Sequence, residues 1–171
     1  MIRSAHPSDA PRLCEIYNHY VISSCISFEE DQVTPEEMSQ RIEATCAKFP
    51  WLVYEHEGVV VGYAYASAWR VRSAYRFSAE STVYIAPEFS RRGIGNALYT
   101  NLLELLRKEG IEIVLGGIAL PNTASVALHE KLGFEKVAHL KRVGWKFAQW
   151  HDVGYWELML NPEHGVSKKK Y

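Results

Sequence analysis

The most informative part of the sequence is the stretch Val83-Tyr84-Ile85-Ala86-Pro87-Glu88-Phe89-Ser90-Arg91-Arg92-Gly93-Ile94-Gly95-Asn96-Ala97-Leu98, where a strand-like run enters a turn and a long amphipathic helix follows. The first amides of a helix lack internal partners, and the helix dipole adds partial positive charge to them. In the turn, Arg91 and Arg92 add full charges, while Gly93 and Gly95 carry no side chain that would hold a ligand away from the amides. The stretch therefore predicts a pyrophosphate site at the beginning of this helix.

Other phosphate-binding motifs fit the same stretch less well. A dinucleotide fingerprint would place a third glycine where Leu98 stands, and a P-loop would end in Gly-Lys-Ser or Gly-Lys-Thr. A plainer alternative stays open, in which the arginines form a solvated face and the glycines make a tight turn.

Helix and strand patterns mix on both sides of this stretch. Ser8 or Asp9 can cap a first helix, and Thr34 can cap a second, with Glu37 completing a capping box and Pro50 ending the helix. The other expected segments are a short strand near Ile2, strands at 51–55, 59–66, 81–86 and 111–118, helices at 93–109 and 124–132, and strand from 134 through 160. We expect an α/β or α+β fold built on one central sheet.

The composition is that of an ordinary globular protein. Of the 171 residues, 47% are hydrophobic and 23% are charged, and the formal net charge is -1. This balance argues against nucleic acid or an acidic membrane as a partner, and no apolar run is long enough to span a bilayer. The three cysteines have neither metal-ligand nor disulfide spacing, so we expect reduced thiols, no bound metal and a cytoplasmic location. The length fits one domain over residues 1–162, with a flexible basic tail at 163–171.

Two motifs in this order resemble those of the GNAT-type N-acetyltransferases. Residues 90–95 are similar to the family's acetyl-CoA pyrophosphate loop, Gln/Arg-x-x-Gly-x-Gly/Ala, with Ser90 at its first position. Residues 122–134, which begin with Asn122 and end in Lys131-Leu132-Gly133-Phe134, resemble the second motif. Within the superfamily the chain looks closest to phosphinothricin and methionine sulfoximine or sulfone acetyltransferases. The stretches that carry this likeness are Ile16-Tyr17-Asn18, Pro50-Trp51-Leu52-Val53, Glu80-Ser81-Thr82-Val83-Tyr84, Leu128-His129-Glu130, Gly144-Trp145-Lys146 and Trp150-His151-Asp152-Val153-Gly154.

The resemblance implies the GNAT fold, a mixed and mostly antiparallel twisted sheet flanked by helices. It also implies transfer of an acetyl group from acetyl-CoA to the amine of a small amino-acid-like molecule, by direct attack in a ternary complex, and a homodimer. Acetyl-CoA would contact one strand, the helix start and the second motif, that is Val83, Tyr84, Ile85, Arg91, Arg92, Gly93, Ile94, Gly95, Asn96, Asn122 and Ser125.

Glu80 and His129 are the candidate catalytic residues. An amine that is protonated in water must lose a proton before it can attack, and a glutamate at the beginning of a buried strand is poorly explained by packing. We expect Glu80 to act as general base, directly or through a water; an ion pair with a nearby arginine is the alternative. The resemblance puts His129 where many related enzymes have a tyrosine that protonates the CoA sulfur, and the sequence does not choose between acid and base for it.

The candidate acceptor residues lie apart in the sequence. Three arginines alternate with aromatics in the run 69–77, and a bidentate clamp on a carboxylate or phosphinate explains this run more economically than nucleic-acid binding does. Arg72 and Tyr75 match the relatives, so we expect Arg72 to bind the substrate carboxylate. Lys146 would assist, and Phe28 lies in a loop that would close over the acceptor.

Two other functions stay open at this stage. Acetylation of a protein N-terminus or lysine would favour an open groove, whereas Arg72, Tyr75 and Lys146 favour a closed pocket for a small acid. A non-catalytic acyl-CoA sensor is less consistent with the presence of both Glu80 and His129.

Overall fold

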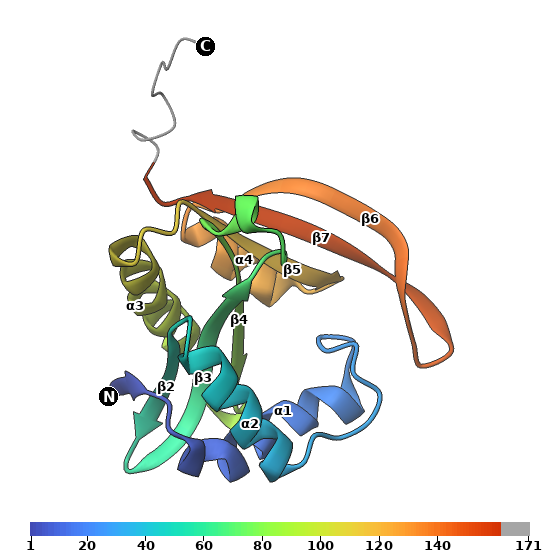
Figure 1. Ribbon diagram of the computed structural model, residues 1–171. Coiled ribbons are helices and arrows are strands. Elements are labelled where there is room, and N and C mark those ends of the chain that lie inside the picture. Colours follow the sequence, from blue (N-terminus) through green and yellow to red (C-terminus); the bar gives the residue numbers. More distant parts are fainter. Residues whose placement is uncertain (162–171) are drawn as a thin grey trace.

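A single seven-stranded sheet runs through the computed structural model, which describes residues 1–161 (Figure 1). The strands lie in the order β1-β2-β3-β4-β5-β7-β6, and every neighbouring pair is antiparallel except β4 and β5. Their bounds are Ile2–Ser4 (β1), Trp51–His56 (β2), Val59–Ala68 (β3), Ser78–Ile85 (β4), Ile113–Leu120 (β5), Glu135–Lys146 (β6) and Gln149–Met159 (β7). The expected fold class is confirmed; the expected domain end at 162 and the tail at 163–171 lie outside the described residues.

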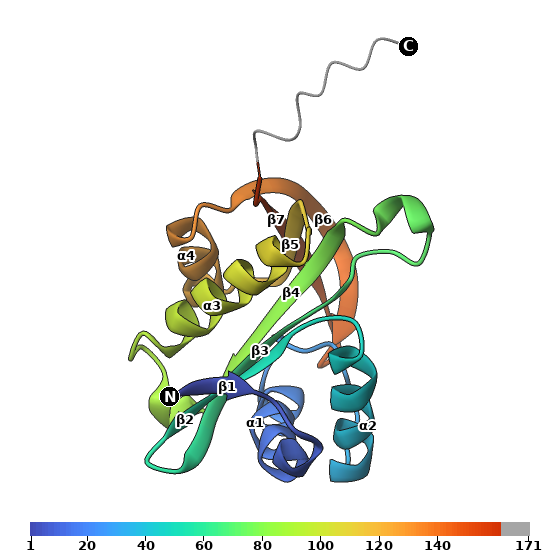
Figure 2. The same cartoon turned by 60° about the vertical axis from the view of Figure 1, so that its left-hand side comes forward.

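Two pairs of helices cover the two faces of the sheet (Figure 2). One face carries α1 (Ala10–Ser23) and α2 (Pro35–Cys46), and the other carries α3 (Ile94–Lys108) and α4 (Thr123–Lys131). Each face has its own buried cluster because apolar side chains at helical spacing meet the alternating side chains of the strands. Short 3-10 helices stand at Pro7–Asp9 (η1), Ser73–Tyr75 (η2) and Pro87–Phe89 (η3).

The beginnings of the first two helices differ in detail from the sequence expectation. The hydroxyl of Thr34 accepts a hydrogen bond from the amide of Glu37 at 3.1 Å, as a cap does. The Glu37 carboxylate does not complete a capping box, because it pairs with Arg41 at 2.5 Å instead. Asp9 likewise binds Arg3 at 2.8 Å and leaves the first amides of α1 without a side-chain cap. Helix α2 ends at Cys46, before Pro50.

The parallel pair β4–β5 is in register over three residues on each strand. Ser78 to Glu80 pair with Ile113 to Leu115, although β4 continues to Ile85 and β5 to Leu120. Up to these last residues, β4 stays paired with β3 on its other side, and β5 stays paired with β7. The two strands therefore separate beyond Glu80, and their facing edges have no strand partner there.

The β6–β7 hairpin forms a long curved arm (Figure 1). Its register shifts between Lys136 and Ala138 and again between Leu140 and Gly144, which bends the arm. Large apolar side chains on it are 42% to 53% exposed, namely Val137, Leu140, Val143, Trp145, Phe147 and Trp150.

No helix within residues 1–161 is long and apolar enough to cross a membrane, and no group of three or more His, Cys, Asp or Glu side chains there is placed to hold a metal ion.

Candidate active site

A cavity of about 90 Å³ lies where β4 and β5 separate. Both strands and the two helices α3 and α4 line it. The lining residues are Ile26, Ser81, Thr82, Val83, Tyr84, Tyr99, Gly117, Ile118, Ala119, Asn122, Ser125 and His129. The structure thus brings together Val83, Tyr84, Asn122 and Ser125, four of the expected cofactor contacts that are far apart in the sequence.

Side chains alternate between the two faces of β4 around this cavity. Ala79 and Val83 pack with the cluster under α3, whereas Tyr84 packs with the cluster under α1 and α2. Because side chains of a strand alternate, Glu80 lies on the same face as Tyr84. The Glu80 side chain is half-buried and, within residues 1–161, its carboxylate has no hydrogen-bond or ion-pair partner.

Burial is the main influence on the Glu80 carboxylate. It raises the pKa of Glu80 above the ordinary glutamate value, and the positive charge of Arg70 opposes this rise. A half-buried carboxylate without a partner and with a raised pKa is suited to accept a proton near neutral pH. The alternative of a structural ion pair is not realised, since no arginine lies within salt-bridge distance of Glu80 among the described residues.

The start of α3 presents the amides that the sequence predicts. The amide of Ala97 donates to the carbonyl of Gly93 at 3.0 Å, so the amides of residues 94–96 precede the first internal bond, and no side chain caps them. Arg91 and Arg92 are both exposed beside this end of the helix. An anion would find three free N–H groups, the positive end of the helix dipole and two guanidinium groups here.

The structure explains the two glycines of this turn in different ways. Gly93 has a φ of 79°, in the left-handed region, and a Cβ on it would meet no atom within 4 Å. A Cβ on Gly95 would lie 3.2 Å from Cδ2 of Leu128. Gly95 thus allows α3 to approach α4 closely. The sequence suggested only that this glycine leaves room for a ligand, whereas the structure shows that it also leaves room for Leu128.

His129 is buried, with 2% of its surface exposed, and both ring nitrogens are occupied. Nδ1 lies 2.8 Å from the carbonyl oxygen of Ser125, and a carbonyl can only accept, so Nδ1 carries the proton. Nε2 then accepts from the hydroxyl of Tyr99 at 3.3 Å. Burial lowers the pKa of His129, although the bond to Ser125 opposes this effect. The ring is therefore neutral at pH 7 and has no nitrogen free to meet a substrate amine.

Asn122 begins α4 as its cap. Its Oδ1 accepts from the amide of Ser125 at 3.1 Å, which leaves the two protons of the Asn122 amide nitrogen for another partner. The side chain lines the cavity, as the expected contact with the CoA arm requires.

Lys146 is buried near the end of β6, and its ammonium group is fully used. It donates to the main-chain carbonyls of Val21, Ser24 and Ser27 at 2.6, 3.0 and 2.7 Å. An ammonium group has three protons, so none is left for a substrate carboxylate. This geometry corrects the expected contact of Lys146 with the substrate: the side chain ties the end of α1 and the segment after it to the β6–β7 hairpin.

Phe28 lies in the same tied segment. A Cβ on Gly144 would be 2.4 Å from Cζ of Phe28, so the ring packs directly on the hairpin backbone. The ring centroids of Phe28 and His151 are 6.0 Å apart, and Nε2 of His151 lies 3.1 Å from Sγ of Cys25. Phe28 is thus held by the hairpin and lies two residues after the cavity residue Ile26 in the same loop.

Arg72 and Tyr75 lie in a different part of the molecule from Lys146. They belong to the loop between β3 and β4, which includes η2 and projects away from the body of the protein (Figure 2). Both residues are exposed, and neither side chain makes a hydrogen bond or ion pair within residues 1–161. The expected cluster of Arg72, Tyr75 and Lys146 therefore does not form within one chain.

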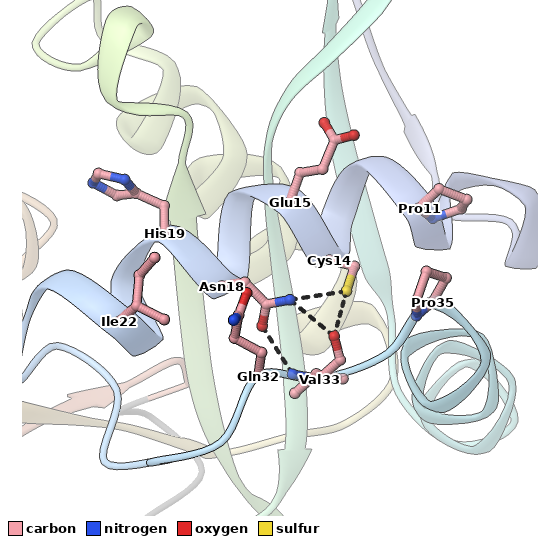
Figure 3. A pocket seen from close by; sticks show the side chains of 9 residues that line it. All are labelled: Pro11, Cys14, Glu15, Asn18, His19, Ile22, Gln32, Val33 and Pro35. Carbon is pink, nitrogen blue, oxygen red and sulfur yellow. Dashed lines mark hydrogen bonds between the residues drawn. The ribbon is translucent and has the colours of Figure 1, made fainter.

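A larger hollow, of about 530 Å³, lies between α1 and the segment before α2 (Figure 3). The side chain of Asn18 holds Val33 through both its oxygen and its nitrogen, at 2.9 and 2.8 Å. Sγ of Cys14 donates to the same Val33 carbonyl at 2.7 Å. These contacts are structural ties that fasten the segment to α1, so we place the chemistry in the smaller cavity between β4 and β5.

The comparison with known families agrees with this geometry. The family model described as the acetyltransferase (GNAT) domain matches residues 2–154. The chain belongs to the GNAT acetyltransferase family. The expected N-acetyltransferase class and GNAT fold are thereby confirmed.

Relatives of this GNAT enzyme are similar over nearly its whole length. A phosphinothricin N-acetyltransferase of Streptomyces viridochromogenes is 43% identical over 91% of this chain and 85% of its own. An L-methionine sulfoximine/L-methionine sulfone acetyltransferase of Salmonella typhimurium is 35% identical over 96% of both chains. The solved structure of a putative acetyltransferase from Salmonella typhimurium with its cofactor acetyl-CoA has a TM-score of 0.93 and 33% identity, over 99% of this chain and 98% of that one.

Three residues of this GNAT site were not singled out from the sequence. Tyr99 lines the cavity and bonds His129, whereas Gly116 and Gly117 leave room for side chains of α4 and β4. A Cβ on Gly116 would lie 2.3 Å from Nε2 of His129, and a Cβ on Gly117 would lie 3.0 Å from Oε1 of Glu80. Two consecutive glycines inside a strand-like run are a signal of close approach that sequence reading can use.

Proposed function

We propose that this enzyme transfers the acetyl group of acetyl-CoA to the α-amine of a small amino-acid-like acceptor of the phosphinothricin or methionine sulfoximine and sulfone type. The observation that carries the proposal is the unpartnered, half-buried carboxylate of Glu80 at the point where β4 and β5 separate. Two relatives named above act on acceptors of this type, which supports the same acceptor class for this chain.

Acetyl-CoA fits the residues around the separated strands. The amides of residues 94–96, with Arg91 and Arg92, would hold the pyrophosphate. The edge of β4 that faces β5 has no strand partner beyond Glu80, so its main chain at residues 83–85 is available to an amide-bearing arm. The nitrogen of Asn122 is available beside it. Acetyl-CoA supplies an electrophilic thioester carbonyl, and a free main-chain amide of β4 is suited to polarise it.

We assign the proton transfer to Glu80 and a positioning role to His129. Glu80 would accept a proton from the ammonium group of the acceptor, directly or through a water, and so leave an amine with a free electron pair. His129 is neutral, fully bonded and buried, so it is proposed to fix the Tyr99 hydroxyl at the cavity wall. The amine then attacks the thioester carbonyl directly in a ternary complex, so that a C–N bond forms and the C–S bond breaks. The CoA thiolate leaves and takes up the surplus proton of the attacking nitrogen, and no covalent enzyme intermediate is needed.

The acceptor carboxylate is proposed to bind arginines of the β3–β4 loop. Arg72 remains the chosen residue, with Tyr75 and Phe28 beside the acceptor. The side chain of Arg72 makes no hydrogen bond or ion pair within the described chain, so its guanidinium is available to bind a carboxylate in a bidentate manner.

Release of free CoA thiol from acetyl-CoA tests the proposal directly. The panel would contain phosphinothricin, methionine sulfoximine, methionine sulfone, the common amino acids and a lysine peptide. We expect saturable turnover with the phosphorus or sulfur compounds, and a loss of about 100-fold or more in kcat for Glu80→Gln with unchanged acetyl-CoA affinity. Turnover of the lysine peptide alone would replace the proposed acceptor by a protein. Acetyl-CoA binding without turnover of any amine would favour a sensor.

We further propose that two copies of the chain associate through the β6–β7 arm. Its exposed apolar side chains form the kind of surface that soluble proteins cover by association. The projecting β3–β4 loop would then have a second chain near it, which would explain why Arg72 has no partner within one chain. Light scattering after size-exclusion chromatography should give a dimer for the native chain and a monomer for Trp145→Lys combined with Phe147→Lys. A native monomer would overturn this proposal.

We propose a cytoplasmic location because of the state of the three cysteines. Cys14, Cys25 and Cys46 are all free thiols in the structure, which fits a reducing compartment. Fractionation of cells that express the tagged chain would test this.

A further inference from the structure

Glu80 and Tyr155 converge on the same glycine. Gly117 on β5 is directly opposite Tyr155 on β7, and an ideal Cβ on Gly117 would lie 3.1 Å from Cε1 of Tyr155. The same Cβ would lie 3.0 Å from Oε1 of Glu80, which reaches over from β4. The edge of the phenol ring and the carboxylate therefore share the space above Gly117.

The ring of Tyr155 is supported from outside by Trp69. The two ring centroids are 5.3 Å apart in an edge-to-face arrangement, and the guanidinium of Arg70 stacks on Trp69 at 4.7 Å. Trp69 begins the β3–β4 loop, where its amide donates to the carbonyl of Ser78 at 3.4 Å. Tyr155 and Trp69 thus form a continuous aromatic wall beside Glu80.

The groups that act electrostatically with Glu80 come from four elements around it. Arg70 of the β3–β4 loop attracts it, and the phenols of Tyr65, Tyr99 and Tyr155 come from β3, α3 and β7. The phenols are neutral at pH 7, because burial raises the pKa of each of the three. Arg70 is therefore the one full charge among these groups, and its attraction favours the ionised carboxylate.

We propose that Tyr155, backed by Trp69, is a positioning residue for Glu80 that keeps water from its carboxylate on the β7 side. The inference rests on the proposed role of Glu80 as base and extends it to residues that do not touch the substrate. Gly117 itself is exposed, so water reaches this space from the open face of the sheet; further water on the β7 side would solvate the ionised carboxylate and add to the effect of Arg70. The wall opposes this, so the carboxylate stays a stronger base at the pH of the cell.

Titration of the Glu80 carboxyl by NMR in the resting enzyme tests the wall without turnover. The protein would be labelled with glutamate that carries ¹³C at the carboxyl carbon, and Glu80→Gln would identify the signal. The variants are Tyr155→Ala, which removes the ring, and Tyr155→Phe, which keeps it. Met159→Ala is the matched control, because Met159 is an exposed side chain of the same strand.

We expect the titration midpoint of Glu80 to move to lower pH in Tyr155→Ala and to stay unchanged in Tyr155→Phe and Met159→Ala. Trp69→Ala, in an exposed loop, should move it in the same direction, and this variant decides the question if Tyr155→Ala does not fold. An unchanged titration midpoint of Glu80 in Tyr155→Ala and Trp69→Ala would overturn the proposed role of the aromatic wall. An equal shift in Tyr155→Phe would also overturn it, since the hydroxyl would then be responsible.

The activity readout separates this inference from the proposed function. In Tyr155→Ala the acidic limb of the kcat profile should move to lower pH, and kcat at neutral pH should fall by about threefold to tenfold with an unchanged KM for acetyl-CoA. If the NMR titration midpoint of Glu80 moves but the acidic limb of the kcat profile does not, the role of the aromatic wall is supported and Glu80 is not the group that accepts the proton.

Discussion

The imidazole of His129 occupies the space that a side chain on Gly116 would need. A Cβ on Gly116 would lie 2.3 Å from Nε2 and 2.6 Å from Cδ2 of the ring. The strand β5 therefore accepts no side chain at the point where α4 packs on it, and the buried bond from Tyr99 to His129 depends on this gap.

Gly116→Ala should destabilise the protein by about 1–3 kcal/mol, because the ring cannot move away without breaking its two bonds. Thermal or urea unfolding measures this change. The matched test is a double-mutant cycle with His129→Ala, which removes the ring and should abolish most of the cost of the added methyl group. A cost that persists in the His129→Ala background would place the clash elsewhere.

Lys146→Met should lower the free energy of unfolding by about 1–3 kcal/mol, since three main-chain carbonyls, two of them buried, would lose their donor. The segment at 24–28 should also become the first site of limited proteolysis. Lys141→Met, an exposed lysine of the same strand, serves as the control and should be neutral. Unchanged stability together with a raised KM for the acceptor would restore the original expectation that Lys146 binds substrate.

Glu80→Gln should make the protein more stable at neutral and mildly alkaline pH. Burial raises the folded-state pKa of Glu80, so the stability that its protonated form provides is present below the unfolded pKa and is lost as pH rises through the folded pKa. The ionised group thus costs stability at about pH 8, and the difference between variant and native Tm should vanish near about pH 4. A Tm difference that does not change with pH would show that burial of the charge is not its cause.

Arg91→Ala combined with Arg92→Ala should weaken acetyl-CoA binding by about tenfold, because exposed charge contacts contribute about 0.5–1 kcal/mol each. The loss should shrink as ionic strength rises, since salt screens exposed charges. Calorimetric titration measures both effects, and Lys108→Ala at the other end of α3 is the control. Equal affinity for the double variant and the control would leave the α3 amides as the sole anion site.

The amino-acid sequence alone was enough to determine the fold class and the position of the candidate cofactor loop. Residues 83–98 carry their signal within one stretch, because a free helix start, a positive-φ glycine and two arginines need no distant partner to be recognised. The boundaries of α3, β2 and β3 followed from periodicity for the same reason. The details of helix capping could not be predicted in this way, since the Glu37 carboxylate pairs with Arg41 and not with a helix amide.

Tertiary structure alone decided which polar side chains are free to do chemistry. Glu80 and Lys146 are both charged residues of expected strands, yet Glu80 has no partner among residues 1–161 and Lys146 binds three carbonyls that lie 119 to 125 residues away. His129 became a neutral, bonded ring for the same reason, because α3 brings Tyr99 to it. A buried polar group must find a partner wherever the fold provides one, and such partners are set by packing and not by sequence distance.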